Sequence, residues 1–237
     1  MITFRDLKAN EIEVRVGRAK SNGVSLLLYK DARCDMNILD ETVCAENWQR
    51  EHYECKGNLF CRVGINVNYE DPSVPEKWIW KSDCGVESNT EAQKGESSDS
   101  FKRSCFCWGL GRELYTAPFI WIDEKNLAEL KKVKVGNREA YKTSDKFCVS
   151  CVRIENKQIT KLQITNTTLG RVVFEFETTL PQYIDEVKQG VLLELYKGDK
   201  DKIYKMFKVD DLSKITESQF VKFNQKLNEA NKKNADS

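Results

Sequence analysis

Apolar and polar side chains alternate most clearly between Leu59 and Tyr69. The apolar positions are Leu59, Cys61, Val63, Ile65, Val67 and Tyr69. Polar side chains such as Arg62, Asn66 and Asn68 stand between them. A period of two is typical of a β-strand with one buried face, so the pattern predicts a strand here.

Two more strands are predicted beside this one. The first runs from Trp48 to Lys56 and ends in a turn at Gly57. The second runs from Trp78 to Ser82, after a break that contains Pro72. Three consecutive strands joined by turns predict a three-stranded sheet.

A long helix is predicted next, from about Thr90 to Trp108. Ser88 and Glu91 fit a capping box, in which each side chain bonds the backbone near the other residue. The apolar face of this helix consists of Phe101, Cys105 and Trp108, spaced four and then three residues apart. Gly109 ends it. The order strand, strand, strand, helix predicts the α+β class.

The segment before the three strands shows weaker patterns. Residues 1–20 are mixed, and Val24 to Tyr29 reads as a short strand. Asp35 is predicted to cap a short helix that ends near Asn47. Its apolar face consists of Met36, Leu39 and Val43.

The composition changes after residue 124. We expect the β-β-β-α core to occupy 1–124, a polar, lysine-rich linker 125–145, and a small β meander 146–178. A helical and partly disordered tail is expected over 179–237, with disorder from Asn231 onward. The last helix carries Phe220, Phe223 and Leu227 on one face. The predicted architecture is therefore a core with a small C-terminal appendage that is β-rich and helical.

Composition narrows the class of protein. Of the 237 residues, 40% are hydrophobic, so a core can form, and no apolar run is long enough to span a bilayer. The N-terminal residues lack a signal-peptide pattern, which predicts a cytoplasmic protein. The formal net charge is only +1. A nucleic-acid site would therefore have to be a groove in which the basic side chains are segregated.

Nine cysteines could indicate disulfides or zinc. An odd number without an export signal argues against a disulfide framework. Only Cys148 and Cys151 form a C-x-x-C pair, and no second pair completes a four-ligand site. In a β-rich run these two are expected to be small core residues, and no metal or cofactor is predicted.

Sequence motifs for enzymes are scarce. His52 is the single histidine, and no phosphate-binding P-loop occurs. A metal-dependent nuclease remains an alternative because Asp83 and Glu87 lie near the third predicted strand. A non-catalytic scaffold, whose tail recruits a single-strand-binding protein, is a further alternative.

Basic side chains recur along the predicted long helix. Lys94, Ser98 and Lys102 are four residues apart and share one helical face. Small hydroxyl residues such as Ser98 beside the lysines leave room for a phosphate backbone to approach. Arg103 adjoins Lys102, so the two side chains point toward different phosphates. Alternatively, Asp99 and Arg103 pair on a solvated face.

At these residues the chain resembles the Rad-fifty-two family of single-strand annealing proteins, and especially the Sak-type recombination proteins of bacteriophages. The resemblance rests on Asp99 to Arg103 and on Trp108 to Tyr115, which include the Lys-Arg pair, the glycine break and the Leu-Tyr end. It extends from about Glu11 to Ile122, roughly half of the chain. It implies a phage or prophage protein of recombination or double-strand-break repair.

The resemblance also implies a ligand and an assembly. Such proteins bind single-stranded DNA in an outer groove of a ring of about ten or eleven subunits and anneal complementary strands without ATP. An exonuclease or a single-strand-binding protein is a possible further partner. The implied DNA contacts are Arg18, Tyr29, Lys102 and Arg103, to which the helix pattern and the motif add Lys94 and Arg112.

Phe106 departs from the family pattern, in which an arginine follows three positions after the Lys-Arg pair. It could stack on a base or pack in the core, and the helical spacing of aromatics favours the core. Three functions are thus weighed: DNA annealing, a metal-dependent nuclease and a scaffold.

Overall fold

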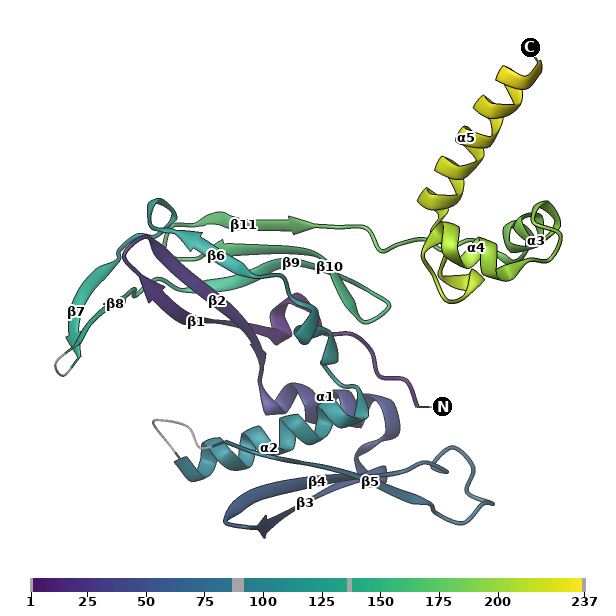
Figure 1. Ribbon diagram of the computed structural model, residues 1–237. Helices are drawn as coiled ribbons and strands as arrows, with labels where there is room; N and C mark the ends of the chain where they lie inside the picture. The colour runs from purple at the N-terminus through teal and green to yellow at the C-terminus, as the bar shows by residue number, and fades with distance from the viewer. Residues whose placement is uncertain (1, 87–91, 136–137, 236–237) are drawn as a thin grey trace. The chain divides into compact units, whose positions relative to one another are not determined.

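The computed structural model describes residues 2–86, 92–135 and 138–235. The chain divides into two compact units, Met1–Thr178 and Thr179–Ser237. Helices and antiparallel sheets are both present, so the predicted α+β class is confirmed. The elements of each unit are labelled in Figure 1.

The first unit contains a six-stranded antiparallel sheet in the order β11-β10-β9-β1-β2-β6. Its strands are β1 (Ile12–Lys20), β2 (Gly23–Lys30), β6 (Ile120–Asp123), β9 (Phe147–Glu155), β10 (Gln158–Asn166) and β11 (Arg171–Glu177). The predicted strands at 24–29 and in the meander are confirmed. Strand β1 lies where the sequence shows no clear pattern.

The domain boundaries predicted within the first unit are wrong. Strand β9 pairs with β1, with Glu13 opposite Cys148, so the meander completes the same sheet as the N-terminal hairpin. The segment predicted as a linker contains a hairpin of β7 (Lys131–Val135) and β8 (Arg138–Lys142). Core and meander therefore form one unit that ends at Thr178.

A second sheet in this unit has the order β3-β4-β5. Its strands are β3 (Trp48–Cys55), β4 (Asn58–Asn66) and β5 (Trp78–Cys84), as the sequence predicts. The apolar face of β4 is buried: Cys61, Val63 and Ile65 are fully inaccessible. Strand β4 ends before Tyr69 because the Asn66 side-chain oxygen accepts hydrogen bonds from the backbone N–H groups of Asn68 and Lys77, which makes a turn.

Helix α2 (Ala92–Trp108) covers the buried face of this sheet. Phe101 and Cys105 are fully buried, as predicted. Ser104 donates to the carbonyl of Cys61 (2.6 Å), and Trp108 Nε1 donates to the carbonyl of Val63 (2.9 Å). These bonds fix the helix against β4. It ends at Gly109, whose φ of 101° favours glycine, whereas the predicted capping box at 88–91 lies outside the described residues.

Helix α1 (Ala32–Val43) precedes the three-stranded sheet. Its N-cap is Asp31, whose carboxylate accepts from the Arg33 N–H (3.0 Å). The predicted cap, Asp35, is instead fully buried within the first turn. The helix ends at Val43 rather than near Asn47, because Cys44 has a φ of 64° and a short helical turn, η2 (Ala45–Asn47), follows.

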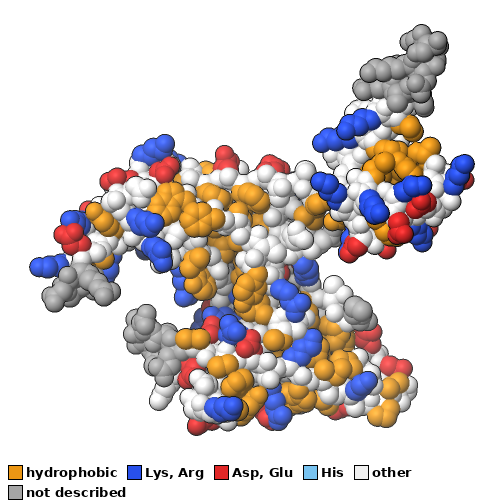
Figure 2. Space-filling model, in the orientation of Figure 1, with side chains coloured by type: hydrophobic (Ala, Val, Ile, Leu, Met, Phe, Trp, Pro, Cys, Tyr) orange, Lys and Arg blue, Asp and Glu red, His pale blue; other side chains and the backbone are white. Residues whose placement is uncertain are grey.

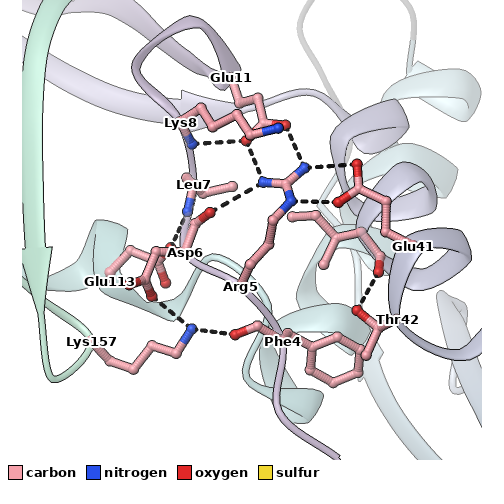
Figure 3. A network of polar contacts seen from close by, with 11 residues as sticks. Phe4, Arg5, Asp6, Leu7, Lys8, Glu11, Glu41, Thr42, Glu113 and Lys157 are labelled. Atoms are coloured by element: carbon pink, nitrogen blue, oxygen red, sulfur yellow. Dashed lines mark hydrogen bonds and ion pairs between the residues drawn. The ribbon is translucent and has the colours of Figure 1, made fainter.

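A polar network holds the N-terminal segment against the rest of the first unit (Figure 3). Arg5 donates to both Glu11 and Glu41, and these bonds lower the pKa of each carboxyl. The backbone N–H of Leu7 donates to Glu113 (2.8 Å). Lys157, in the turn between β9 and β10, donates to the Phe4 carbonyl (2.7 Å). Segments far apart in sequence are thereby joined.

The short helices of this unit not yet named are η1 (Ala9–Glu11), η3 (Arg112–Thr116) and η4 (Glu124–Asn126).

The second unit is helical and has its own core. It contains α3 (Glu186–Leu195), α4 (Lys200–Phe207), η5 (Leu212–Lys214) and α5 (Glu217–Ala235). Its core consists of Ile184, Leu192, Ile203, Phe207, Leu212, Ile215 and Phe220. The predicted last helix is confirmed, and α5 runs to Ala235. Among the described helices of the whole chain, none combines the length and apolar character needed to cross a membrane.

Candidate functional site

A cavity of about 230 Å³ lies where β2, α2 and η3 meet. Three cationic side chains and three aromatic rings line it: Lys30, Lys102, Arg103, Tyr29, Phe106 and Tyr115. Asp99 is the one acidic side chain on its wall. Tyr29, Lys102 and Arg103, three of the DNA contacts implied by the resemblance, are therefore brought together.

Local structure explains how these side chains reach the cavity. Tyr29 is the penultimate residue of β2, and 37% of it is exposed. Lys102 and Arg103 follow the buried Phe101 on α2 and are half-buried beside the core-facing stripe. Tyr115, on η3, is 69% exposed. The opening of the cavity is therefore bordered by cationic and aromatic side chains.

Arg103 pairs with a different acid from the one expected. Its guanidinium contacts Asp83 on β5 at 3.2 Å, whereas Asp99 accepts a hydrogen bond from the backbone N–H of Val86 (3.1 Å). The predicted Asp99–Arg103 pair is therefore wrong. Arg103 Nε is buried and has no hydrogen-bond partner among the described residues. The guanidinium is thus only partly satisfied by its hydrogen bond to Asp83.

Lys30, which lines the cavity, forms a buried ion pair with Asp35 that the sequence pattern does not indicate. Lys30 and Asp35 are 2% and 0% exposed, and Lys30 Nζ donates to Asp35 and to the carbonyl of Leu110 (2.9 Å). Burial raises the pKa of Asp35 to about 6, although the neighbouring charge of Lys30 lowers it. Gly111 is required beside this pair because its φ is 64° and a Cβ there would lie 2.9 Å from Lys30 Nζ.

Phe106 forms a wall of the cavity. Its ring lies edge-on to that of Tyr115, with centroids 5.0 Å apart, and Lys30 Nζ is 4.1 Å from its centroid. The core position favoured by helical spacing is therefore wrong, because Phe106 is only half-buried and lines the opening. An edge-to-face aromatic pair beside two cations presents ring surface to a ligand.

Three predicted contacts lie elsewhere. Lys94 is exposed near the start of α2, away from the cavity lining. Arg112 donates to the carbonyl oxygens of Phe106 and Cys107 and so closes the C-terminal end of α2. Arg18, on β1, lines a second cavity of about 330 Å³ together with Lys20, Phe119 and Trp121. Arg18 is therefore not brought to the cavity that Tyr29, Lys102 and Arg103 line.

The side chains considered for metal or nuclease chemistry are dispersed. All nine cysteines lie within the described ranges and are free of disulfides, and Cys148 is exposed rather than in the core. His52 Nε2 lies 3.1 Å from Ser97 Oγ on the exposed side of β3. Asp83 pairs with Arg103, and Glu87 lies outside the described residues. Over the described part of the chain, no cluster of three or more His, Cys, Asp or Glu could hold a metal ion.

The surface charge is mixed on the face that Figure 2 shows, where basic, acidic and apolar side chains are interspersed. This agrees with the net charge of +1. Cationic side chains gather locally in the two cavities described above. No protein-family model, curated protein or solved structure matches the chain.

Proposed function

We propose that this protein binds single-stranded DNA and anneals complementary strands without ATP, as an oligomeric ring. The observation that carries the proposal is the cavity at which Tyr29, Lys102 and Arg103 converge with Phe106 and Tyr115. Cations beside exposed rings are the combination that binds single strands without sequence preference. The resemblance of the Asp99–Tyr115 segment to annealing proteins supports the same function.

The geometry suits annealing for a physical reason. Lys102 and Arg103 offer salt-sensitive contacts to phosphates, which carry no sequence information. The rings of Tyr29 and Tyr115 offer stacking surface, which every base can use. A strand held in this way keeps its pairing edges free for a complementary strand. We therefore place the protein in recombination or double-strand-break repair, encoded by a phage or prophage and acting in the bacterial cytoplasm.

An annealing assay tests the proposal. Labelled complementary oligonucleotides are mixed with the protein, with and without magnesium, and both duplex formation and strand length are followed. Accelerated duplex formation without metal supports annealing. Shortened strands that appear only with magnesium would support a nuclease. No effect on either readout would leave the scaffold, with the second unit recruiting a single-strand-binding protein or an exonuclease.

We expect a closed ring in solution. Strands β3 and β5 are the edges of the three-stranded sheet, and edges of this kind are commonly covered by a neighbouring element or subunit. A ring of about ten or eleven copies covers them repeatedly. Light scattering or native mass measurement at micromolar concentration checks this. A monomer under these conditions would contradict it.

DNA affinity should fall as salt rises, despite the near-neutral net charge. The two phosphate contacts from Lys102 and Arg103 alone contribute about −1.4 to the slope of a plot of log affinity against log salt. Affinity per site then drops about sevenfold between 50 and 200 mM salt. Fluorescence anisotropy with a labelled oligonucleotide measures the slope. A flat response would rule out phosphate binding by these side chains.

A further inference from the structure

The second cavity, of about 330 Å³, holds the most exposed large apolar side chain of the described residues, Phe119. This side chain is 78% exposed and lies nearly parallel to the ring of Trp121, with an angle of 17° and centroids 6.3 Å apart. Burial in the core does not explain the position of Phe119. A parallel aromatic pair in solvent presents a flat stacking surface.

The backbone around this pair is shaped to hold it. Trp121 lies opposite Ser25, and its Nε1 donates to Asp123 (3.2 Å), which fixes the indole. A Cβ at Gly23 would lie 2.2 Å from the Ile122 carbonyl and 3.0 Å from the Trp121 ring. Only glycine therefore permits this close approach of β2 and β6 beneath the indole.

Two cations border the aromatic pair. Arg18 and Lys20 are exposed, and within the described ranges neither forms an ion pair, in contrast to Arg15, which pairs with Glu13. A bulge between Val16 and Arg18 lets the Arg18 N–H donate to Ser25 Oγ (3.0 Å). The bulge thus directs Arg18 toward the cavity that Ser25 also lines.

Side chains on one face of β2 line both cavities. Tyr29 lines the first cavity, and Leu27 and Ser25 line the second. These three side chains alternate along the strand and so point to the same side, spanning about 13 Å. Arg15 lies 5.0 Å from the Tyr29 ring, on the neighbouring strand. A bound chain could therefore pass from one cavity to the other over cationic and aromatic side chains.

We infer that Phe119 and Trp121 form a base-stacking platform, and that Arg18 and Lys20 bind the phosphates of the same single strand where it leaves the first cavity. This inference rests on the proposed function and extends its site. Aromatic rings and arginine also occur at protein interfaces, whereas lysine is depleted there, so the choice of a nucleic acid rests on the two cations that have no acidic partner among the described residues. The unpaired cations match a polyanion, and the exposed rings match its bases.

Phe119→Ala tests the platform in the full-length protein. The probes are a labelled oligothymidylate of about 12 nucleotides, within the usual range of single-strand sites, and an abasic oligonucleotide of equal length. We expect Phe119→Ala to weaken thymidylate binding about tenfold, equivalent to about 1.4 kcal/mol, and abasic binding less than twofold. Phe119→Trp should restore the preference for bases. Tyr183→Ala is the matched control, since this tyrosine is also exposed but lies in the second unit.

The outcomes separate the platform from the wider function. Equal losses on both probes, or wild-type affinity of Phe119→Ala, would overturn the platform while leaving DNA binding by Lys102 and Arg103 intact. Failure of the wild-type protein to bind either probe would overturn both proposals. A change in mass in solution with unchanged affinity would identify the surface as a contact between copies, which also overturns the platform. A melting temperature equal to that of wild type confirms that Phe119→Ala is folded.

Discussion

Changing Lys102 and Arg103 together to alanine should lower the affinity for single-stranded DNA at least a hundredfold and reduce annealing to the uncatalysed rate. Both phosphate contacts of the first cavity are lost, and the loss recurs in every subunit that one strand contacts. Alanine favours helix, so α2 should stay folded. The Arg103–Asp83 pair is partly exposed and contributes at most about 1 kcal/mol.

The matched control removes two positive charges from the second unit instead. Lys200 and Lys205 are exposed on α4, and no ion pair involves either of them among the described residues. Changing both to alanine should leave annealing unchanged. Annealing rate, thermal melting and mass are measured on both double variants. Wild-type annealing by the Lys102/Arg103 variant would refute the site, whereas a lost ring or a collapsed melting temperature would identify the pair as structural.

Lys30→Met should destabilise the first unit by about 3–5 kcal/mol, because Asp35 then stays buried without a counter-ion. For a unit of this size the melting temperature should fall by roughly 6–20 °C. The double variant Lys30→Met/Asp35→Leu removes both charges and should recover most of the loss. Denaturant titration at pH 7.5 measures these differences. A double variant as unstable as the single one would show that packing, not charge, is the cause.

Lowering the pH should reduce the loss of stability that Lys30→Met causes. The pKa of Asp35 is about 6 in the folded protein, above the ordinary value of 3.8, so between these values the folded state binds a proton that the unfolded state does not. Protonation of Asp35 therefore adds stability as the pH falls through 6, and it removes the uncompensated charge in the variant. The difference between wild type and Lys30→Met should shrink from pH 7.5 to pH 5. A difference in stability that stays constant over this pH range would contradict the role of Asp35 as the buried charge that Lys30 compensates.

Local patterns were sufficient for strands with one buried face. The alternation around Val63 predicts β4, and the spacing from Phe101 to Cys105 predicts the buried side of α2, because each reports burial on a single element. Pairing between distant strands leaves no such local pattern, so the junction of β1 with β9 was missed. The hairpin at 131–142 was predicted as a linker because three of the five residues of β7 are lysines, and the alternation of Val133 and Val135 with them is too short to stand out.

The candidate site was predictable only in part. Lys102 and Arg103 follow from helical spacing and from the resemblance, and the structure brings them to Tyr29. Lys30 and Asp35 were missed because charged residues at a strand end and a helix start usually belong to solvated turns and caps. Their burial depends on Leu110 and Gly111, which come from a distant part of the chain.

The pairing of β9 with β1 also sets an order of events during synthesis. Strand β1 and its hairpin partner β2 emerge from the ribosome early, but the strand on the other side of β1 begins only at Phe147. Until then β1 lacks the pairing of Glu13 with Cys148 on that side, and an open strand edge invites pairing with other chains. Contacts so distant in sequence also slow folding. Nascent chains that stop before Phe147 would thus be the aggregation-prone species, and productive folding of the first unit waits for its last three strands.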